Sequence, residues 1–261
     1  MKKNKFIFII LVLILTLAAL IQGCAQKENK LIPKDANAIF DAENMLGLNS
    51  IPTTGCTTTS WVNLVNSAFN GAFTCINGNS GFEGNGSTTL PYKVTFNGSG
   101  TYVSTNIDQQ PTNQESVTWI IWVYPTDLTL ATQSLLSIDD HNGAYNRALL
   151  INNGMFTVYN GVGSFSPVAA TLNTWQQIVV TFTPSSITLY KNNQAFPMGF
   201  APVIKNTAQT LQIGKSGAGS FDFFKGSIAW IGLFNRALTA KEIKDSCTSL
   251  VNKFAGAACS N

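Results

Sequence analysis

Apolar and polar residues alternate in short runs along most of the chain, a pattern that predicts β-strands separated by turns. The strongest run covers residues 117–124, which are rich in β-branched and aromatic side chains and end at Pro125, as expected of a buried strand. An Asn-Gly pair at residues 153–154 is typical of a tight hairpin. The same pattern predicts further strands at residues 147–151, 155–159, 176–182, 187–190, 211–214 and 227–234.

Short strands at intervals of roughly 8–12 residues are typical of a sandwich or jelly roll. We therefore predict an all-β fold, a two-sheet antiparallel jelly-roll sandwich. Residues 50–90 are rich in Thr, Gly and Asn and are predicted to form long loops. One alternating set of central-strand residues should fill the core. That set is Trp119, Ile121, Val123, Ile178, Val180 and Phe182, or their alternates on the opposite face.

One short C-terminal helix is also predicted. Thr239 and Glu242 have the spacing of a capping box, in which each side chain satisfies a free backbone N–H group at the helix start. Apolar residues then recur on one face, as an amphipathic helix requires. They are Ile243, Cys247, Leu250 and Val251.

The first residues have the order of a secretory signal: a basic region at 1–5, an apolar run at 6–21, and then Gln-Gly-Cys. The apolar run of about 16 residues is shorter than the roughly 20 that span a bilayer, which argues against an uncleaved anchor. Residues 20–24 (LIQGC) resemble the lipobox of bacterial lipoproteins. The resemblance implies a signal peptide at 1–23 and a diacylglyceryl group on Cys24, which becomes the mature N-terminus.

Residues 24–35 are then a polar lipidated tether, and residues 36–261 form the domain. The expected location is the bacterial cell envelope, in the outer membrane if the organism has one, facing the periplasm or the exterior. Ala25 follows the cysteine, so the Asp-type signal for inner-membrane retention is absent. The bilayer is one expected partner, held through the acyl chains on Cys24.

Charge argues against nucleic acid as a partner. Only 11% of residues are charged, less than half of the usual share of about 25%. Three of the 16 basic residues, Lys2, Lys3 and Lys5, precede the apolar run, so the rest of the chain has 13 basic and 13 acidic residues. A neutral surface without a basic stretch is unsuited to a phosphate backbone.

Four cysteines remain after Cys24, in a compartment that permits disulfides. Proximity in the sequence favours Cys56–Cys75 and Cys247–Cys259, although four cysteines allow three pairings. Each such loop would add about 3 kcal/mol of stability. The rival interpretation is a metal site, but no Cys-x-x-Cys occurs and the single histidine lies far away.

Catalytic candidates are few. Jelly-roll glucanases carry a Glu-x-Asp-x-Glu string that this chain lacks. A pair such as Glu83 with Asp139 could serve a divergent hydrolase or lyase, but no spacing supports it. His141 follows Asp139 and Asp140 in a polar segment, and a surface histidine is favoured over a general base.

The same segment offers hard oxygens from Asp139, Asp140 and Asn142, with Asp222 reaching in from another loop. A plain turn is the favoured interpretation. The alternative is a weak calcium site with an affinity of about 10⁻⁴ to 10⁻³ M, as in extracellular modules.

Five segments, in order, resemble laminin-G-like domains of the concanavalin A-like lectin/glucanase jelly rolls. They are residues 61–71, 94–98, 116–125, 173–192 and 224–238, within a resemblance that covers residues 38–250. The chain departs from the family at Asn63 and Asn97, which replace Asp, and at residues 228–231 (IAWI), where the family often has Ile-Asp-Glu-Val. The resemblance implies sugar or protein binding, often with calcium. Because acidic residues of the family are replaced at these positions, the expectation of calcium binding is weaker than that of sugar or protein binding.

These observations predict a non-catalytic, membrane-anchored lipoprotein that binds a glycan or an extracellular protein. Aromatic rings in turn-rich segments could stack on sugar faces, although burial of each ring is the commoner outcome. The candidates are Tyr145, Tyr159, Phe165, Phe221 and Phe223. The alternatives are a divergent glycan hydrolase or lyase, and a structural envelope protein.

Overall fold

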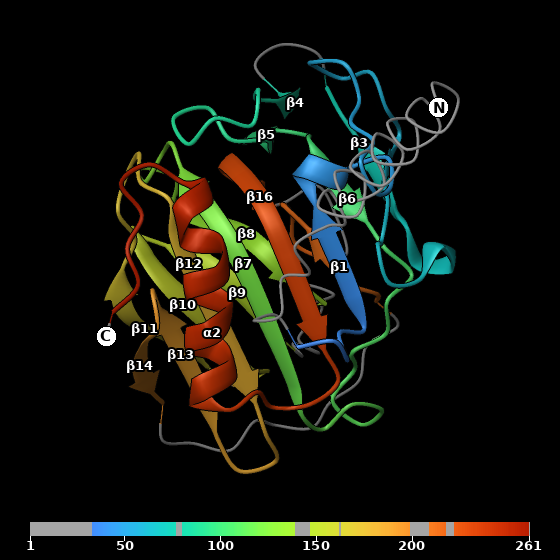
Figure 1. Cartoon of the computed structure of the whole chain (residues 1–261). Coiled ribbons are helices and arrows are strands. Elements are labelled where there is room, and N and C mark those ends of the chain that lie inside the picture. Colours follow the sequence, from blue (N-terminus) through green and yellow to red (C-terminus); the bar gives the residue numbers. More distant parts are fainter. Residues whose placement is uncertain are drawn as a thin grey trace, which may run out of the picture.

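A computed structural model describes residues 33–76, 80–138, 147–161, 163–198, 209–217 and 222–260. Two antiparallel sheets pack face to face, and one helix lies on the outside of the first sheet (Figure 1). The predicted all-β sandwich with one C-terminal helix is therefore confirmed. Within the described residues, no helix combines the length and the apolar composition that crossing a membrane requires.

Sheet A contains the longest strands. In spatial order it holds β14 (Gln194–Pro197), β13 (Ile187–Lys191), β12 (Gln176–Phe182), β7 (Val117–Pro125), β16 (Lys225–Phe234), β5 (Lys93–Asn97) and β4 (Gly81–Glu83). The first half of β16 pairs with β5, and its second half pairs with β1 (Ala38–Asp41). Helix α2 (Ala240–Leu250) covers the outer face of this sheet, the face turned away from the other sheet.

Sheet B holds the shorter strands. Its order is β11 (Ser164–Ala169), β10 (Met155–Tyr159), β9 (Ala148–Asn152), β8 (Thr132–Ser137), β15 (Gln212–Ile213), β6 (Tyr102–Ser104), β3 (Gly71–Thr74) and β2 (Ser60–Trp61). Three 3₁₀ turns complete the described elements: η1 (Ala42–Asn44), η2 (Ser67–Phe69) and η3 (Val251–Lys253). Residues 50–90 were predicted as loops only, which is wrong, because β2, β3 and β4 lie there.

Strand β7 is buried on both faces. The predicted core set, which includes Trp119 and Ile121, faces sheet B. Its alternates Ile120, Trp122 and Val179 are equally buried, in a second cluster beneath α2. An uninterrupted apolar strand is therefore explained by a sheet that is covered on one side by a second sheet and on the other by a helix.

Two disulfides join Cys56 to Cys75 and Cys247 to Cys259, with Cα–Cα distances of 5.5 Å and 6.0 Å. These are the pairings that proximity in the sequence favours. The second disulfide ties the end of the chain back to helix α2, so residues 251–260 form a closed segment, which we call the C-terminal strap.

Helix α2 begins at the predicted capping box. The Thr239 hydroxyl accepts from the Glu242 N–H, and the Glu242 carboxylate accepts from the Thr239 N–H at 2.8 Å. Glu242 also accepts two hydrogen bonds from Arg236, from Nη1 at 3.0 Å and from Nη2 at 2.6 Å. Asp35 accepts two more, from Nε at 2.6 Å and from the same Nη2 at 3.1 Å. Arg236 therefore clamps Asp35, three residues before β1, to the start of the helix. Its hydrogen bonds hold the pKa of Glu242 at about 2.

Candidate ligand-binding pocket

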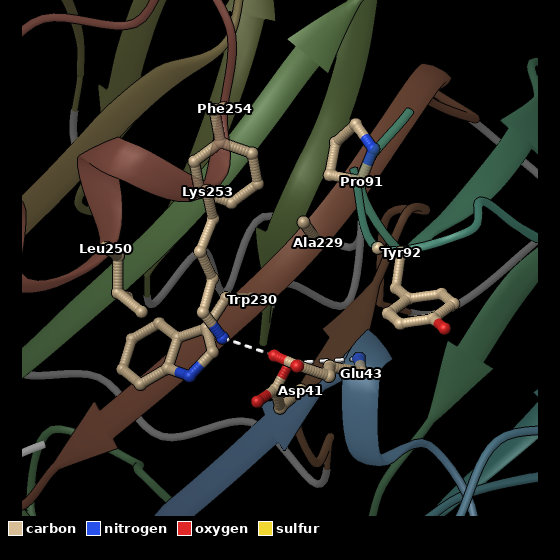
Figure 2. Close-up of a pocket in the computed structure, with 10 residues that line it drawn as sticks. Asp41, Glu43, Pro91, Tyr92, Ala229, Trp230, Leu250, Lys253 and Phe254 are labelled. Carbon is tan, nitrogen blue, oxygen red and sulfur yellow. Dashed lines mark hydrogen bonds and ion pairs between the residues drawn. The ribbon is translucent and has the colours of Figure 1, made fainter. Parts of the chain in front are cut away.

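A pocket of about 430 Å³, open to solvent, lies on the outer face of sheet A beyond the C-terminal end of α2 (Figure 2). We call it the α2 pocket. Four parts of the chain build it: the end of β1 with η1, the segment that leads into β5, the middle of β16, and the end of α2 with the strap. It is lined by Asp41, Glu43, Gly86, Pro91, Tyr92, Ala229, Trp230, Leu250, Lys253 and Phe254.

A β-bulge in β16 supplies part of the lining. The pairing of β16 with β7 shifts between Ile228 and Trp230, which leaves Ala229 without an opposite residue. A bulge turns successive side chains toward the same face, so both Ala229 and Trp230 line the pocket. These are the two positions at which the resembling laminin-G-like domains often carry acids.

The acidic side of the pocket begins where β1 ends. Asp41 caps η1, because its two carboxylate oxygens accept hydrogen bonds from the Glu43 N–H and the Asn44 side chain, both at 3.0 Å. The resulting turn lifts the carboxylate of Glu43 to the pocket, where Lys253 of η3 binds it. Figure 2 shows Lys253 pointing from the strap toward both carboxylates.

Charge and burial oppose each other in this corner. Desolvation raises the pKa of Asp41 above its usual range, although the charge of Lys253 acts in the opposite direction. Desolvation would lower the pKa of Lys253, but the charge of Asp41 and the hydrogen bond with Glu43 outweigh it and raise that pKa. The corner therefore has two carboxylates and one ammonium group, so a hydroxyl group of a ligand would find both donors and acceptors there.

Aromatic rings form the other walls. Trp230 is 3% exposed and Phe254 is 5% exposed, so their edges form the floor. Phe254 stacks on Trp122 at a ring-centroid distance of 4.6 Å and lies 4.7 Å from Trp175. Tyr92 is half-buried on the side opposite Trp230. An apolar floor below a charged rim is the general form of a small-ligand site.

The two asparagines that replace family acids both hold backbone turns. The Asn63 side-chain oxygen accepts from the N–H groups of Ile39 and Val65 at 3.1 and 3.0 Å. The Asn97 oxygen accepts from three successive N–H groups, at residues 99–101. An amide oxygen is sufficient for these bonds, so the turns do not need a carboxylate.

The predicted aromatic candidates do not meet at this pocket. Tyr159 on β10 and Phe165 on β11 are half-buried in sheet B. Phe223 lies beside Tyr102 at a centroid distance of 6.2 Å, and Lys215 lies over the Tyr102 ring. Tyr145 and Phe221 lie outside the described residues.

The predicted calcium loop is largely outside the described part of the chain, as are His141 and the lipidation candidate Cys24. Those loop residues are Asp139, Asp140 and Asn142. Asp222 is described, and its carbonyl accepts from the Ser134 N–H at 2.7 Å. Within the described ranges, no three His, Cys, Asp or Glu side chains gather so as to hold a metal ion. Glu83, proposed as a catalytic partner of Asp139, is paired with Lys93 at 3.3 Å.

The pocket residues were missed because they come from distant segments. Asp41 and Trp230 are opposite each other only because β1 pairs with β16. Tyr92 directly precedes β5, whose alternating pattern gives no sign of a site, and Lys253 lies just after the predicted helix. The departure of residues 229–230 from the family pattern was the one signal in the sequence that pointed here.

Comparisons with known proteins agree with this architecture. A family profile described as the concanavalin A-like lectin/glucanases superfamily (Laminin_G_3) matches residues 97–244, more than half of the chain. No curated protein matches the sequence.

Two solved structures illustrate the shared fold. A Trypanosoma rangeli sialidase is similar with a TM-score of 0.60 and 14% identity, over 86% of this chain and 34% of the sialidase. The receptor binding domain of botulinum neurotoxin C/D mosaic serotype has a TM-score of 0.54 and 13% identity, over 83% of this chain and 52% of that one. This chain thus spans about a third of the sialidase and half of the toxin fragment. From the family match, this chain belongs to the laminin-G-type family of the concanavalin A-like lectin/glucanases superfamily.

Proposed function

We propose that this protein is a lipid-anchored envelope protein that binds carbohydrate at the α2 pocket without altering it chemically. The observation that carries the proposal is the pairing of aromatic walls with a charged rim in one open cavity. A sugar ring has an apolar face that can stack on an aromatic ring, and hydroxyl groups that need donors and acceptors. Tyr92 supplies the ring at the rim, and Glu43 with Lys253 supplies the acceptors and donors.

Lipid anchoring rests on the sequence around Cys24. The basic, apolar and small-residue zones stand in order before it, and a cysteine closes the apolar run. Two or three acyl chains would hold the protein stably on a membrane. The domain would then present the pocket in the periplasm or at the cell surface.

A glycan hydrolase or lyase is a second candidate, and one observation favours it. Desolvation raises the pKa of Asp41 in a cavity that also contains Glu43, and a proton donor needs a raised carboxyl pKa. Both carboxylates have structural partners, however, because Asp41 caps η1 and Glu43 binds Lys253. Release of reducing ends from a polysaccharide, lost in Asp41→Asn, would establish this candidate instead.

The test of the proposed function is a glycan array on the soluble domain, with calcium and with a chelator. The expected result is binding of one class of glycan by the wild type and its loss in Tyr92→Ala. Tyr159→Ala is the matched control, since it removes a half-buried tyrosine from the opposite sheet. Binding that survives Tyr92→Ala and is lost in Tyr159→Ala would place the site on sheet B. A blank array would favour a protein ligand or a structural role.

A further inference from the structure

Two further cavities follow the α2 pocket along the outer face of sheet A. The middle cavity is lined by Thr88, Thr89, Pro91, Lys93, Tyr124, Asn173, Trp175 and Ala255. The edge cavity is lined by Glu83, Thr95, Phe96, Asn97, Ser99, Thr126 and Lys225. Their strand residues belong to β4, β5, β7 and β16 of sheet A, and neither cavity is lined by a residue of α2.

The three cavities are neighbours. The α2 pocket and the middle cavity share Pro91, and the strap crosses their boundary, where the Ala255 N–H donates to the Thr88 carbonyl at 2.8 Å. The middle and edge cavities adjoin along β5, because Lys93 and Thr95 are alternate residues of one strand and face the same side. From Lys93 to Asn97 strand β5 advances roughly 13 Å, which suits a short chain of sugars better than a single one.

The middle cavity repeats the aromatic wall of the first. Trp175 and Tyr124 lie with their ring centroids 5.3 Å apart, and Trp175 also contacts Phe254 of the α2 pocket. One packed aromatic cluster therefore lies beneath both the first and the second cavity. The edge cavity is more polar, with Thr95, Asn97 and Thr126 in its lining.

Each cavity also contains a lysine paired with a carboxylate. Lys253 binds Glu43 in the α2 pocket. Lys93 of the middle cavity binds Glu83 of the edge cavity at 3.3 Å. Lys225 of the edge cavity binds Asp127 at 3.0 Å. The charges within each of these three pairs cancel, and Asp41 adds one more carboxylate. The cavities therefore have no excess of positive charge that would attract a polyanion.

We infer that the three cavities form one groove for an uncharged polysaccharide chain, with at least one sugar unit in each cavity. The inference rests on the proposed function and deepens it, because it names the ligand as a neutral oligosaccharide. The paired charges offer hydrogen bonds to hydroxyl groups, and the half-buried rings of Tyr92 and Tyr124 offer stacking surfaces in the first two cavities. A sulfated or uronic-acid chain would meet a groove that is neutral or slightly acidic.

The experiment is a calorimetric titration of the soluble domain with neutral gluco- and xylo-oligosaccharides of one to about six units, and with heparin fragments of matched length. We expect affinity to rise by roughly tenfold or more from one unit to three, and to depend little on salt because no counterions are released. Heparin fragments should bind more weakly than neutral chains of the same length.

A variant that fills only the edge cavity tests the groove itself. Thr126 is exposed, so Thr126→Trp should fold normally and should weaken binding of chains of three or more units while sparing single units. Thr248→Trp, at an exposed position of α2 outside the groove, is the matched control.

The outcomes separate the two proposals. Affinity that is independent of length, with binding still lost in Tyr92→Ala, would overturn the groove and leave the proposed function standing. Tighter, salt-dependent binding of heparin would overturn the neutral ligand. A failure of every carbohydrate to bind, at any length, would overturn the proposed function as well.

Discussion

Phe254→Ala would test how firmly the strap is packed on sheet A. Its ring is 5% exposed and lies against both Trp122 and Trp175. Burying a phenylalanine side chain is worth about 1.5–3 kcal/mol, and each aromatic pair adds about 0.5–1.5 kcal/mol. The expected loss of unfolding free energy is therefore about 3–5 kcal/mol, which is also typical of Phe→Ala in a core. The Cys247–Cys259 disulfide should keep the strap attached, so the loss should not exceed this range.

The assay is urea unfolding, followed by tryptophan emission, to which Trp122 and Trp175 contribute as two of the five tryptophans. Phe69→Ala is the control, since that ring is 39% exposed at the end of η2 and its removal should cost less than about 1 kcal/mol. If Phe254→Ala costs no more than Phe69→Ala, and the emission of the folded protein is unchanged, the ring is not packed between the two tryptophans. Phe254 would then not form the floor of the α2 pocket.

Three further predictions concern the anchor, the clamp and calcium. Cys24→Ser should remain full length and unlipidated, because serine lacks the thiol that accepts diacylglycerol; a mutant that is cleaved and still enters the detergent phase would refute the lipobox. Arg236→Ala should lower the free energy of unfolding by about 1 kcal/mol at neutral pH, since the ion pairs of Arg236 with Asp35 and Glu242 are partly exposed. The pKa of Glu242 is lowered from 4.5 to about 2 in the folded state, so this contribution is complete above pH 4.5 and is lost as the pH falls toward 2. Urea midpoints of both proteins should therefore converge in acid, and a constant difference would show that the ion pair is not its source. For a weak calcium site with an affinity of about 10⁻⁴ to 10⁻³ M, calcium at about 5 mM should raise the melting temperature and micromolar calcium should not. A shift that persists in Asp139→Ala and Asp140→Ala would place calcium elsewhere.

The long elements could be predicted because their signals are local. Strand β12 was predicted with the bounds that the structure has, since seven successive residues favour a strand and turns flank them. The capping box placed the start of α2 for the same reason. Strands β2, β3 and β4 have only two to four residues, too few for a periodic pattern to show, and they form because neighbouring strands pair with them.

The pocket could not be predicted because its residues come together only when strands that are distant in the sequence pair with one another. Nothing near Asp41 in the sequence indicates that it will lie opposite Trp230, and the bulge at Ala229 is visible only against β7. Candidate rings such as Tyr159 were chosen because turn-rich segments are usually exposed. That rule does not say which of the two sheets a ring will lie on, and Tyr159 lies on the sheet opposite the pocket.

The clamp at Arg236 sets how the domain would stand on a membrane. Asp35, which it holds, lies at one end of β1, and Asp41 of the pocket lies at the other end. Helix α2 likewise begins at the clamp and ends at the pocket, about 16 Å away for eleven residues. Anchored through Cys24 as proposed, the clamp could lie no farther from the acylated cysteine than the reach of eleven residues, about 36–40 Å. The clamp would be the pole nearest to the point of attachment, and the groove would open at the opposite pole, on the side that long polymers of the wall or the exterior can approach.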